Sequence, residues 1–362
     1  MKNILIIDDS ALMRRVLSDI IESDERFQVI DVAINGLNGL NVLQSRVGEV
    51  DAVLLDINMP IMNGLELLAE LKKQNIKVKV IIVSTIAVKE AKEVILALEL
   101  GAFDFVTKPE SYDGVKSNKF SERILSCLAV ATNVRVRTKQ RTGEEALEQE
   151  VAEAVIIDGS KKHRRLLKKG SKLVAIACST GGPKALHSVI PSLPENLDAP
   201  ILIVQHMPQG FTKSLSDRLN ELSKIKVKEA EHEEILKKGT VYLAKGGYHL
   251  RLHRLEDGQY QIKLAKEASR HGLLPCADIM YESLTDTDFD QITCVVLTGM
   301  GGDGTAGIKE LNKSKNIYVI AQNEETSIVY GMPKVITESG LVDEIVALQE
   351  VSDAIIKNVG VH

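Results

Sequence analysis

The sequence predicts an α/β protein with two doubly wound, mostly parallel sheets, one in each half of the chain. Apolar runs of strand length alternate with segments of helical spacing before residue 125, the alternation fades through a stretch of segregated charge, and it resumes at Leu173. We expect one domain over residues 1–125, a charged linker over 126–171 and a second domain over 172–357. The length of 362 residues suits about two or three domains.

The composition is that of an ordinary water-soluble protein, with 44% apolar and 26% charged residues. The net charge of -5 gives no bulk electrostatic reason to bind nucleic acid. Asp8 and Asp9 interrupt the first apolar run too early for a secretory signal, and no window approaches a membrane span. We therefore expect a cytoplasmic protein with no direct membrane insertion. Its cysteines lie in apolar surroundings without metal-type spacing, which predicts buried reduced thiols: Cys127, Cys178, Cys276 and Cys294.

Five apolar runs predict the strands of the first sheet: Ile4–Asp8, Val29–Ala33, Ala52–Asp56, Val80–Val83 and Phe103–Thr107. Four of these runs end in polar side chains that a buried strand does not need, and all would lie on one rim of the sheet: Asp8, Asp9, Asp56, Ser84 and Lys108. Three carboxylates at one rim repel each other unless a cation such as Mg²⁺ lies among them. Any one of them alone could be a solvated surface group, but their coincidence at four strand ends favours a phosphoryl-accepting site.

This set resembles the receiver domain of two-component response regulators, which has a flavodoxin-like fold. The resemblance rests on Asp8-Asp9, Asp56, Asn58-Met59-Pro60, Asn63-Gly64, Ser84 and Thr107-Lys108-Pro109. It implies that Asp56 is the phosphoacceptor and that Mg²⁺ is held by Asp8, Asp9, Asp56 and the backbone carbonyl of Asn58. It also implies that Ser84 donates to the phosphoryl group, that Lys108 pairs with it, and that Phe105 is the aromatic switch residue. In that family the peptide bond at the position of Lys108–Pro109 is usually cis.

The expected linker has segregated charge: residues 132–142 are basic, 144–153 acidic and 161–172 basic again. Such a stretch with few aromatic residues favours an exposed linker with a short helix over Glu145–Val155. The alternative is a patch for nucleic acid or an acidic partner. No recognition-helix or stacking-aromatic pattern accompanies the basic residues, so we expect no nucleic acid.

Three strand ends in the second domain carry the elements of a hydrolytic triad. Ser179 follows the apolar run Leu173–Cys178, and His206 and Asp303 follow two later runs. Groups at the carboxyl ends of parallel strands meet at one rim, where a histidine can serve as base to a hydroxyl and an aspartate can orient the imidazole. Each residue alone has a plainer interpretation: Ser179 as a helix N-cap, His206 as a hydrogen-bonded structural group, and Asp303 as a turn former.

The nucleophile elbow of the α/β-hydrolases is not the pattern here. Ala177 replaces the first glycine of G-x-S-x-G and the order is Ser, His, Asp, so an unrelated fold is predicted. The glycine-rich loop around Ser179 leaves backbone N–H groups free to bind an oxyanion.

The second half is similar to the catalytic domain of the chemotaxis protein-glutamate methylesterases. The motifs are CSTGGP, QHMP, GF, YLAKGGYHL, PCAD, LTGMGGDG and AQNEETSIVYGMP. The resemblance implies a Rossmann-like domain in which Ser179 is the nucleophile, His206 the base and Asp303 its orienting carboxylate. It places Thr180 and Met300 beside the site, with the backbone N–H of Met300 as a candidate oxyanion donor.

Together the two resemblances imply a phosphorylation-activated carboxylic ester hydrolase of chemotaxis. It would remove methyl esters from receptor glutamates, deamidate receptor glutamines and be phosphorylated by a chemotaxis histidine kinase. Its substrate would be the cytoplasmic helical region of methylated chemoreceptors. Mg²⁺ is expected in the receiver domain and no cofactor in the catalytic domain. Without phosphate, the receiver is expected to cover the catalytic rim. Two other functions remain open: a DNA-binding response regulator that uses the basic linker, and a nucleotide or phosphate site without covalent chemistry.

Two departures from the second pattern stand close to the site. Cys178 replaces a small residue under Ser179, and Leu273-Leu274-Pro275-Cys276-Ala277-Asp278 stands where the family usually reads His-Arg-Pro-Ser-Val-Asp. The arginine position is therefore occupied by Leu274. Of the other histidines, His249 and His253 alternate with leucines in a strand-like pattern, and we expect both on a solvated face, with no zinc site.

Overall fold

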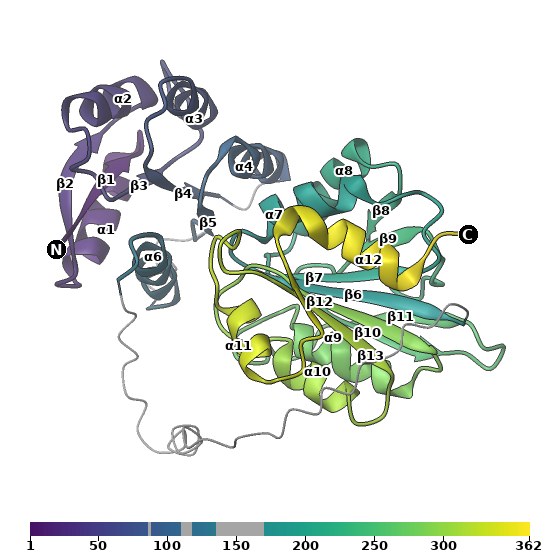
Figure 1. The fold of residues 1–362 in the computed structure, drawn as a ribbon. Coiled ribbons are helices and arrows are strands. Elements are labelled where there is room, and N and C mark those ends of the chain that lie inside the picture. The colour runs from purple at the N-terminus through teal and green to yellow at the C-terminus, as the bar shows by residue number, and fades with distance from the viewer. Residues whose placement is uncertain (86–87, 110–117, 135–169) are drawn as a thin grey trace, which may run out of the picture.

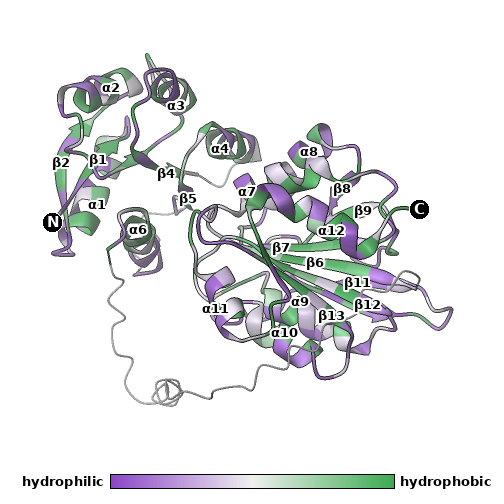
Figure 2. Cartoon of the chain, viewed as in Figure 1, coloured by the Kyte–Doolittle hydropathy of each residue, from purple (hydrophilic) through white to green (hydrophobic). Residues whose placement is uncertain are grey.

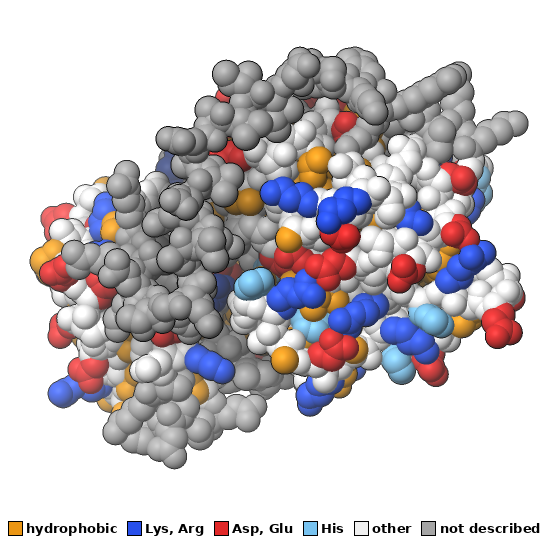
Figure 3. Space-filling model, turned by 90° about the horizontal axis from the view of Figure 1, so that it is seen from below, with side chains coloured by type: hydrophobic (Ala, Val, Ile, Leu, Met, Phe, Trp, Pro, Cys, Tyr) orange, Lys and Arg blue, Asp and Glu red, His pale blue; other side chains and the backbone are white. Residues whose placement is uncertain are grey.

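The computed structural model describes residues 1–85, 88–109, 118–134 and 170–362. The expected linker helix and nearly all of the basic and acidic stretches of the linker lie outside the described residues. Among the described residues, no helix combines the length and the apolar character needed to span a bilayer. On the face drawn in Figure 3, acidic and basic side chains are interspersed over the described surface.

The first sheet is fully parallel, in the order β2-β1-β3-β4-β5 (Figure 1). Helices α1 and α6 pack on one face, and α2, α3 and α4 on the other. The elements are β1 (Lys2–Ile7), α1 (Ala11–Glu22), β2 (Phe27–Ala33), α2 (Gly36–Ser45), β3 (Ala52–Leu55), α3 (Gly64–Lys73), β4 (Lys79–Ser84), α4 (Val88–Leu100), β5 (Asp104–Thr107) and α6 (Asn118–Ala131). All five predicted strands are present: the runs in β1, β3, β4 and β5 are buried within the sheet, and the edge strand β2 is partly exposed.

Polar caps begin the helices of this domain where the sequence changes from strand to helix. Ser10 accepts a hydrogen bond from the backbone of Met13 at the start of α1, and Asn63 and Glu66 form a reciprocal capping box at the start of α3. Helix α6 continues to Ala131, beyond the boundary expected at residue 125. Its Cys127 and Leu128 are buried in the core of the first domain, so this helix belongs to that domain in full.

The second sheet has seven parallel strands in the order β14-β13-β12-β6-β7-β9-β8. Helices α7, α8 and α12 cover one face, and α9, α10 and α11 cover the other (Figure 1). The strands are β6 (Lys172–Cys178), β7 (Ile201–Gln205), β8 (Lys226–Glu229), β9 (Thr240–Leu243), β10 (His249–Arg254), β11 (Tyr260–Ala265), β12 (Gln291–Val296), β13 (Ile317–Gln322) and β14 (Glu344–Val346). The helices are α7 (Gly182–Val189), η1 (Ile190–Ser192), α8 (Phe211–Leu222), α9 (Ala277–Ser283), η2 (Leu284–Asp286), α10 (Thr305–Leu311), α11 (Met332–Glu338), η3 (Leu348–Glu350) and α12 (Val351–Val359).

The chain reverses its direction across this sheet between β6 and β12. From β6 the chain proceeds to β7 and then to the edge strand β8. It returns through β9, which lies between β7 and β8, and reaches β12 on the other side of β6. In open α/β sheets the carboxyl ends of the strands beside such a switch point form the ligand crevice. Figure 2 shows the central strands as the most hydrophobic part of this domain, which leaves the polar chemistry to the loops at their ends.

Three local features differ from expectation. Strands β10 and β11 form an antiparallel hairpin outside the main sheet, which the alternation of runs did not predict. His249 in β10 is fully buried, and its Nε2 lies 3.0 Å from the carbonyl oxygen of Ala268, so the predicted solvated face is wrong for this residue because the hairpin packs against α9. Among the described residues the cis peptide bond is Leu274–Pro275 and not Lys108–Pro109.

Candidate active site

Ser179 lies between the end of β6 and the start of α7, at the switch point. Its backbone N–H donates to the carbonyl of Thr298 (3.0 Å), and its carbonyl accepts from Gln205 Nε2 (3.0 Å). The helix N-cap is Gly181, in the left-handed region at φ 78°, where glycine has no steric penalty. The N-cap interpretation of Ser179 is therefore wrong, and its half-buried side chain is left for another role.

The loop after β12 lies directly against Ser179. A Cβ atom added to Gly299 would come within 2.9 Å of the Ser179 Cβ, so only glycine permits this approach. Met300 follows at once, half exposed, and it lines the same cavity as Ser179. Met300 is thus placed in the loop that packs on Ser179.

His206 and Asp303 contact each other across the rim. The Nε2 atom of His206 lies 2.7 Å from Asp303 Oδ2, and the two side chains are 11% and 5% exposed. Burial alone would raise the pKa of Asp303, but the hydrogen bonds from His206 and from the backbone N–H of Ala277 lower it well below its ordinary value. The carboxyl is therefore ionised at neutral pH and faces the imidazole, so it can stabilise a positive charge there.

Ser179 and His206 line two adjoining cavities of about 320 and 400 Å³. In this arrangement of the described residues, no hydrogen bond joins the Ser179 hydroxyl to His206. Catalytic hydrogen bonds are often long in unliganded structures and tighten when the substrate is bound. The second domain contributes four apolar residues to the walls of the first cavity: Met207, Pro208, Leu273 and Leu274.

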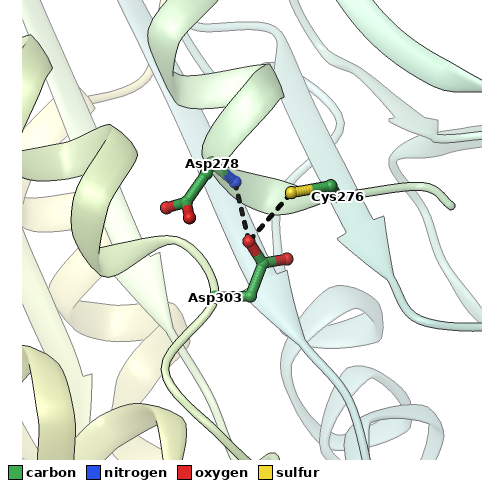
Figure 4. Close-up of side chains that lie close together, drawn as sticks. All are labelled: Cys276, Asp278 and Asp303. Carbon is green, nitrogen blue, oxygen red and sulfur yellow. Dashed lines mark hydrogen bonds between the residues drawn. The ribbon is translucent and has the colours of Figure 1, made fainter. Parts of the chain in front are cut away.

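A second group of side chains surrounds Asp303. The Cys276 thiol donates to Asp303 Oδ1 (3.1 Å), and the backbone N–H groups of Ala277 and Asp278 donate to its two oxygens (2.6 and 3.0 Å). Figure 4 shows the Asp303 carboxylate pointing toward the Cys276 sulfur and the Asp278 backbone nitrogen, while the Asp278 carboxylate is directed elsewhere. The Asp278 carboxylate accepts from the backbone of Gly304 (2.9 Å) and of Gly307 (2.7 Å).

Ligand atoms of Cys276, Asp278 and Asp303 lie within 4.8 Å of one another, close enough to bind one metal ion together. The chemistry of the cluster does not fit a cation. Burial raises the pKa of the Cys276 thiol to about 12, so metal binding would have to displace a tightly held thiol proton. Backbone N–H donors already point at both carboxylates, and they would face a bound cation with like charge.

The first domain packs onto this rim through α4, β5 and α6. Asp104 in β5 accepts a hydrogen bond from the Thr180 hydroxyl (2.9 Å), and Arg123 in α6 pairs with the same carboxylate (3.2 Å) and lines both cavities. The Phe105 and Phe211 rings stack with centroids 4.8 Å apart. The cavities beside Ser179 are therefore closed in part by residues of the first domain.

An ion-pair group adds to this contact on the α4 side. Glu99 makes a bidentate pair with Arg218 in α8 (2.8 and 3.1 Å), and His187 Nε2 lies 3.0 Å from the same carboxylate. Burial lowers the pKa of His187 below its ordinary value. The domain contact thus combines aromatic stacking, a buried neutral-to-charged hydrogen bond and a charged pair.

The rim of the first sheet brings together the predicted carboxylates. Ligand atoms of Asp8, Asp9 and Asp56 lie within 4.8 Å of one another, and the Lys108 ammonium lies 2.8 Å from Asp8 and 2.9 Å from Asp56. Burial, which outweighs the opposing pull of Lys108, raises the pKa of Asp56 to about 6. The carboxylate oxygens of Asp8, Asp9 and Asp56 are hard ligands gathered at one strand-end rim, with Asp9 exposed to solvent, so these residues fit Mg²⁺.

The remaining predicted residues of this rim are only partly gathered. Asn58 follows Asp56 in the same loop. The Ser84 hydroxyl donates to Glu90 (3.2 Å), and no hydrogen bond between Ser84 and Asp56 is present among the described residues. The Phe105 ring stacks on Phe211 of the second domain.

Comparisons with known proteins identify the family of both halves of the chain. A family model described as CheB methylesterase matches residues 174–355, and one described as response regulator receiver domain matches residues 4–117. The protein-glutamate methylesterase/protein-glutamine glutaminase 1 of Syntrophomonas wolfei is 40% identical over 359 residues, which is 98% of this chain and 98% of the relative. The chain belongs to the CheB methylesterase family.

Other family members give the same result. The protein-glutamate methylesterase/protein-glutamine glutaminase of Halalkalibacterium halodurans is 39% identical over 354 residues, 98% of this chain and 97% of the relative. The crystal structure of the Thermotoga maritima CheB methylesterase catalytic domain matches with a TM-score of 0.50 and 39% identity, covering 52% of this chain and 99% of that one. The similarity therefore extends over both halves of the chain.

Within this CheB methylesterase family member, sequence reasoning missed the side chains that hold the site. Asp104 is a buried charge within the otherwise apolar run Phe103–Val106, which is a signal that could have been read. Arg123 and the hydrogen bonds of Cys276 had no comparable signal, because both depend on where distant loops and helices come together.

Proposed function

We propose that the chain is a phosphorylation-activated hydrolase that removes methyl esters from glutamate side chains of chemoreceptors and deamidates receptor glutamines to glutamate. The single observation that supports it most is the short contact between His206 and a buried, ionised Asp303 beside Ser179 at one strand-end rim. The names of the relatives support the substrate and the two reactions.

Ser179 is the nucleophile in this proposal. Since Nε2 of His206 faces Asp303, Nδ1 is the nitrogen left to accept the hydroxyl proton. The Ser179 oxygen then attacks the side-chain carbonyl carbon of the methyl ester, and His206 returns the proton to the leaving methoxide, which departs as methanol. A water molecule attacks the acyl-enzyme in the same way and releases the glutamate carboxyl. With a glutamine substrate the leaving group is ammonia.

Asp303 orients the imidazole and stabilises its charged form. The negative oxygen of the tetrahedral intermediate needs donors from the backbone, and the N–H of Met300 is our candidate because the loop at Gly299 packs on Ser179. Thr180 flanks the nucleophile.

Asp56 is the phosphoacceptor, with Asp8, Asp9 and the carbonyl of Asn58 completing a magnesium site. The ion would neutralise the carboxylates and hold phosphoryl oxygens when bound. Lys108 would pair with the phosphoryl group. Ser84 would donate to it after leaving Glu90, so phosphorylation would rearrange the start of α4.

Phosphorylation controls the hydrolase by shifting the contact between domains. In the arrangement described here, Asp104, Phe105 and Arg123 close in the rim around Ser179. Phosphoryl-Asp56 would favour an open arrangement that admits the helical region of a receptor. The phosphodonor is a chemotaxis histidine kinase, and the enzyme acts in the cytoplasm.

The test is methanol release from methylated receptor membranes. The full chain should release methanol slowly alone and faster with a small-molecule phosphodonor and magnesium. Asp56→Asn should keep the slow rate and lose the stimulation. Stimulation that survives in Asp56→Asn would refute the assigned phosphoacceptor, and no methanol from the unaltered chain under any condition would refute the function.

A further inference from the structure

Asp303 receives more hydrogen bonds than its partnership with His206 requires. Its Oδ2 lies near His206 Nε2 and the backbone N–H of Ala277, and its Oδ1 accepts from the Cys276 thiol and the backbone N–H of Asp278 (Figure 4). Three of these four donors come from consecutive residues at the start of α9. The carboxylate is therefore held by a segment distant in sequence from both His206 and the loop of Asp303.

The buried thiol of Cys276 is suited to donate a hydrogen bond. Its side chain is completely buried, and burial together with the nearby charge of Asp303 keeps the thiol protonated at neutral pH. A thiol that stays protonated offers one hydrogen, and the sulfur lies 3.1 Å from Asp303 Oδ1. Hydrogen bonds to an ionised acceptor are stronger than those between neutral groups.

The Asp278 side chain fixes the backbone that follows Asp303. It accepts from the backbone of Gly304 and Gly307, the residues that carry Asp303 into α10. Residues 276–278 thus fix both the carboxylate of Asp303 and the backbone that follows it.

We propose, building on the hydrolase function above, that Cys276 is a positioning residue that fixes the Asp303 carboxylate and weakens its pull on the His206 proton, with Asp278 anchoring the loop. The physical basis is competition for the carboxylate charge. Each donor on Oδ1 withdraws part of the negative charge that would otherwise stabilise a protonated imidazole. Removing the thiol donor should therefore make His206 easier to protonate.

The other ionisable groups near His206 set the background for this effect. Asp278 and Arg123 line the cavity that His206 shares with Ser179, and His271 lies on the same wall. These groups are unchanged when only position 276 is altered, so a shift measured between variants at that position reports the thiol.

The experiment compares Cys276→Val with Cys276→Ser in the full chain. Valine has no donor and is larger than cysteine by about one methyl group, whereas serine restores a donor. Methanol release is measured from pH 5 to 9, and the His206 imidazole is titrated by NMR. In Cys276→Val we expect kcat to fall several-fold and the His206 pKa to rise by on the order of half a unit. Cys276→Ser should stay near the original profile. Cys294→Val, which removes another buried thiol of the domain, is the matched control.

The two readouts separate the proposal from the function on which it rests. The NMR titration reports the coupling between Asp303 and His206 even if no variant releases methanol. Equal His206 titration in the valine and serine variants, with both folded by circular dichroism, would overturn the positioning role. A shift of the His206 pKa downward in Cys276→Val would overturn it as well.

Discussion

The hydroxyl of Thr180 donates a hydrogen bond to Asp104 across the boundary between the two domains, at 2.9 Å. Thr180 directly follows the proposed nucleophile, and Asp104 directly precedes Phe105, which stacks on Phe211. The bond therefore joins the strand that ends at the phosphoacceptor rim of one sheet to the loop that carries Ser179 in the other. A displacement of β5 would therefore reach the loop of Ser179 through the Thr180–Asp104 hydrogen bond.

Under the proposed control by phosphorylation, removing this bond should raise the rate of methanol release in the absence of phosphate. Asp104→Ala deletes the acceptor for Thr180 and the partner of Arg123. A hydrogen bond to a charged group contributes about 1.5–3 kcal/mol, so we expect basal methanol release to rise on the order of tenfold. The assay is methanol release without phosphodonor. Glu49→Ala, at an exposed carboxylate of the same domain, should leave the rate unchanged. An Asp104→Ala enzyme as slow as the unaltered chain would show that this contact does not restrain the site.

Asp56, the proposed phosphoacceptor, should reduce the stability of the folded protein at neutral pH when magnesium is absent. The pKa of Asp56 is raised to about 6 in the folded protein, whereas an unfolded Asp titrates near 3.9. The folded state therefore binds the extra proton between these values, and the contribution of Asp56 to stability is lost as pH rises through 6. Asp56→Asn should raise the free energy of unfolding by about 1–3 kcal/mol at pH 7.5.

Urea unfolding at two pH values tests the predicted pH dependence of this stability difference. The advantage of Asp56→Asn should shrink at pH 5, where the Asp56 carboxyl of the unaltered chain is largely protonated. Magnesium should narrow the difference at pH 7.5, because it binds the carboxylates of the folded state. An advantage that grows as pH falls would contradict the raised pKa.

Ile61 lies in a strained turn close to Asp56 in sequence. Its φ is 71°, the backbone N–H of Met62 donates to the carbonyl of Pro60 (2.8 Å), and the side chain is 77% exposed. A β-branched residue at the centre of such a γ-turn has a strained backbone. Because its side chain is exposed, no packing energy offsets that strain. We expect Ile61→Gly to raise the free energy of unfolding by about 1 kcal/mol.

The matched control for that prediction is Val47→Gly. Val47 is exposed to the same extent, 77%, and its φ is not positive. There glycine should be neutral or destabilising, since it only adds freedom to the unfolded chain. Urea unfolding that shows the two glycine variants equally destabilised would mean that the turn at Ile61 carries no strain.

The sequence was sufficient to predict which strand-end residues gather at each rim. It was insufficient to predict the contacts that position their side chains. Ser179, His206 and Asp303 could be predicted because the carboxyl ends of parallel strands share one rim, whatever the details of packing. The same rule gathered Asp8, Asp9 and Asp56. This rule does not predict the hydrogen-bond partner of Ser84, whose hydroxyl donates to Glu90.

His249 and Cys276 show why the rest could not be predicted. Alternation in β10 indicated one buried and one solvated face, but the hairpin packs against α9 and buries the histidine as well. Cys276 reaches Asp303 only because α9 begins beside the loop after β12. Both outcomes depend on long-range packing, which local patterns do not contain.

The most direct test of the central claim is methanol release from methylated receptors by Ser179→Ala. The side chain is half buried and small, so alanine should preserve the fold, as circular dichroism and thermal unfolding can verify. We predict that the folded variant releases no methanol above background, with or without phosphodonor, while the unaltered chain releases it in both. Methanol release by folded Ser179→Ala at the rate of the unaltered chain would show that this serine is not the nucleophile.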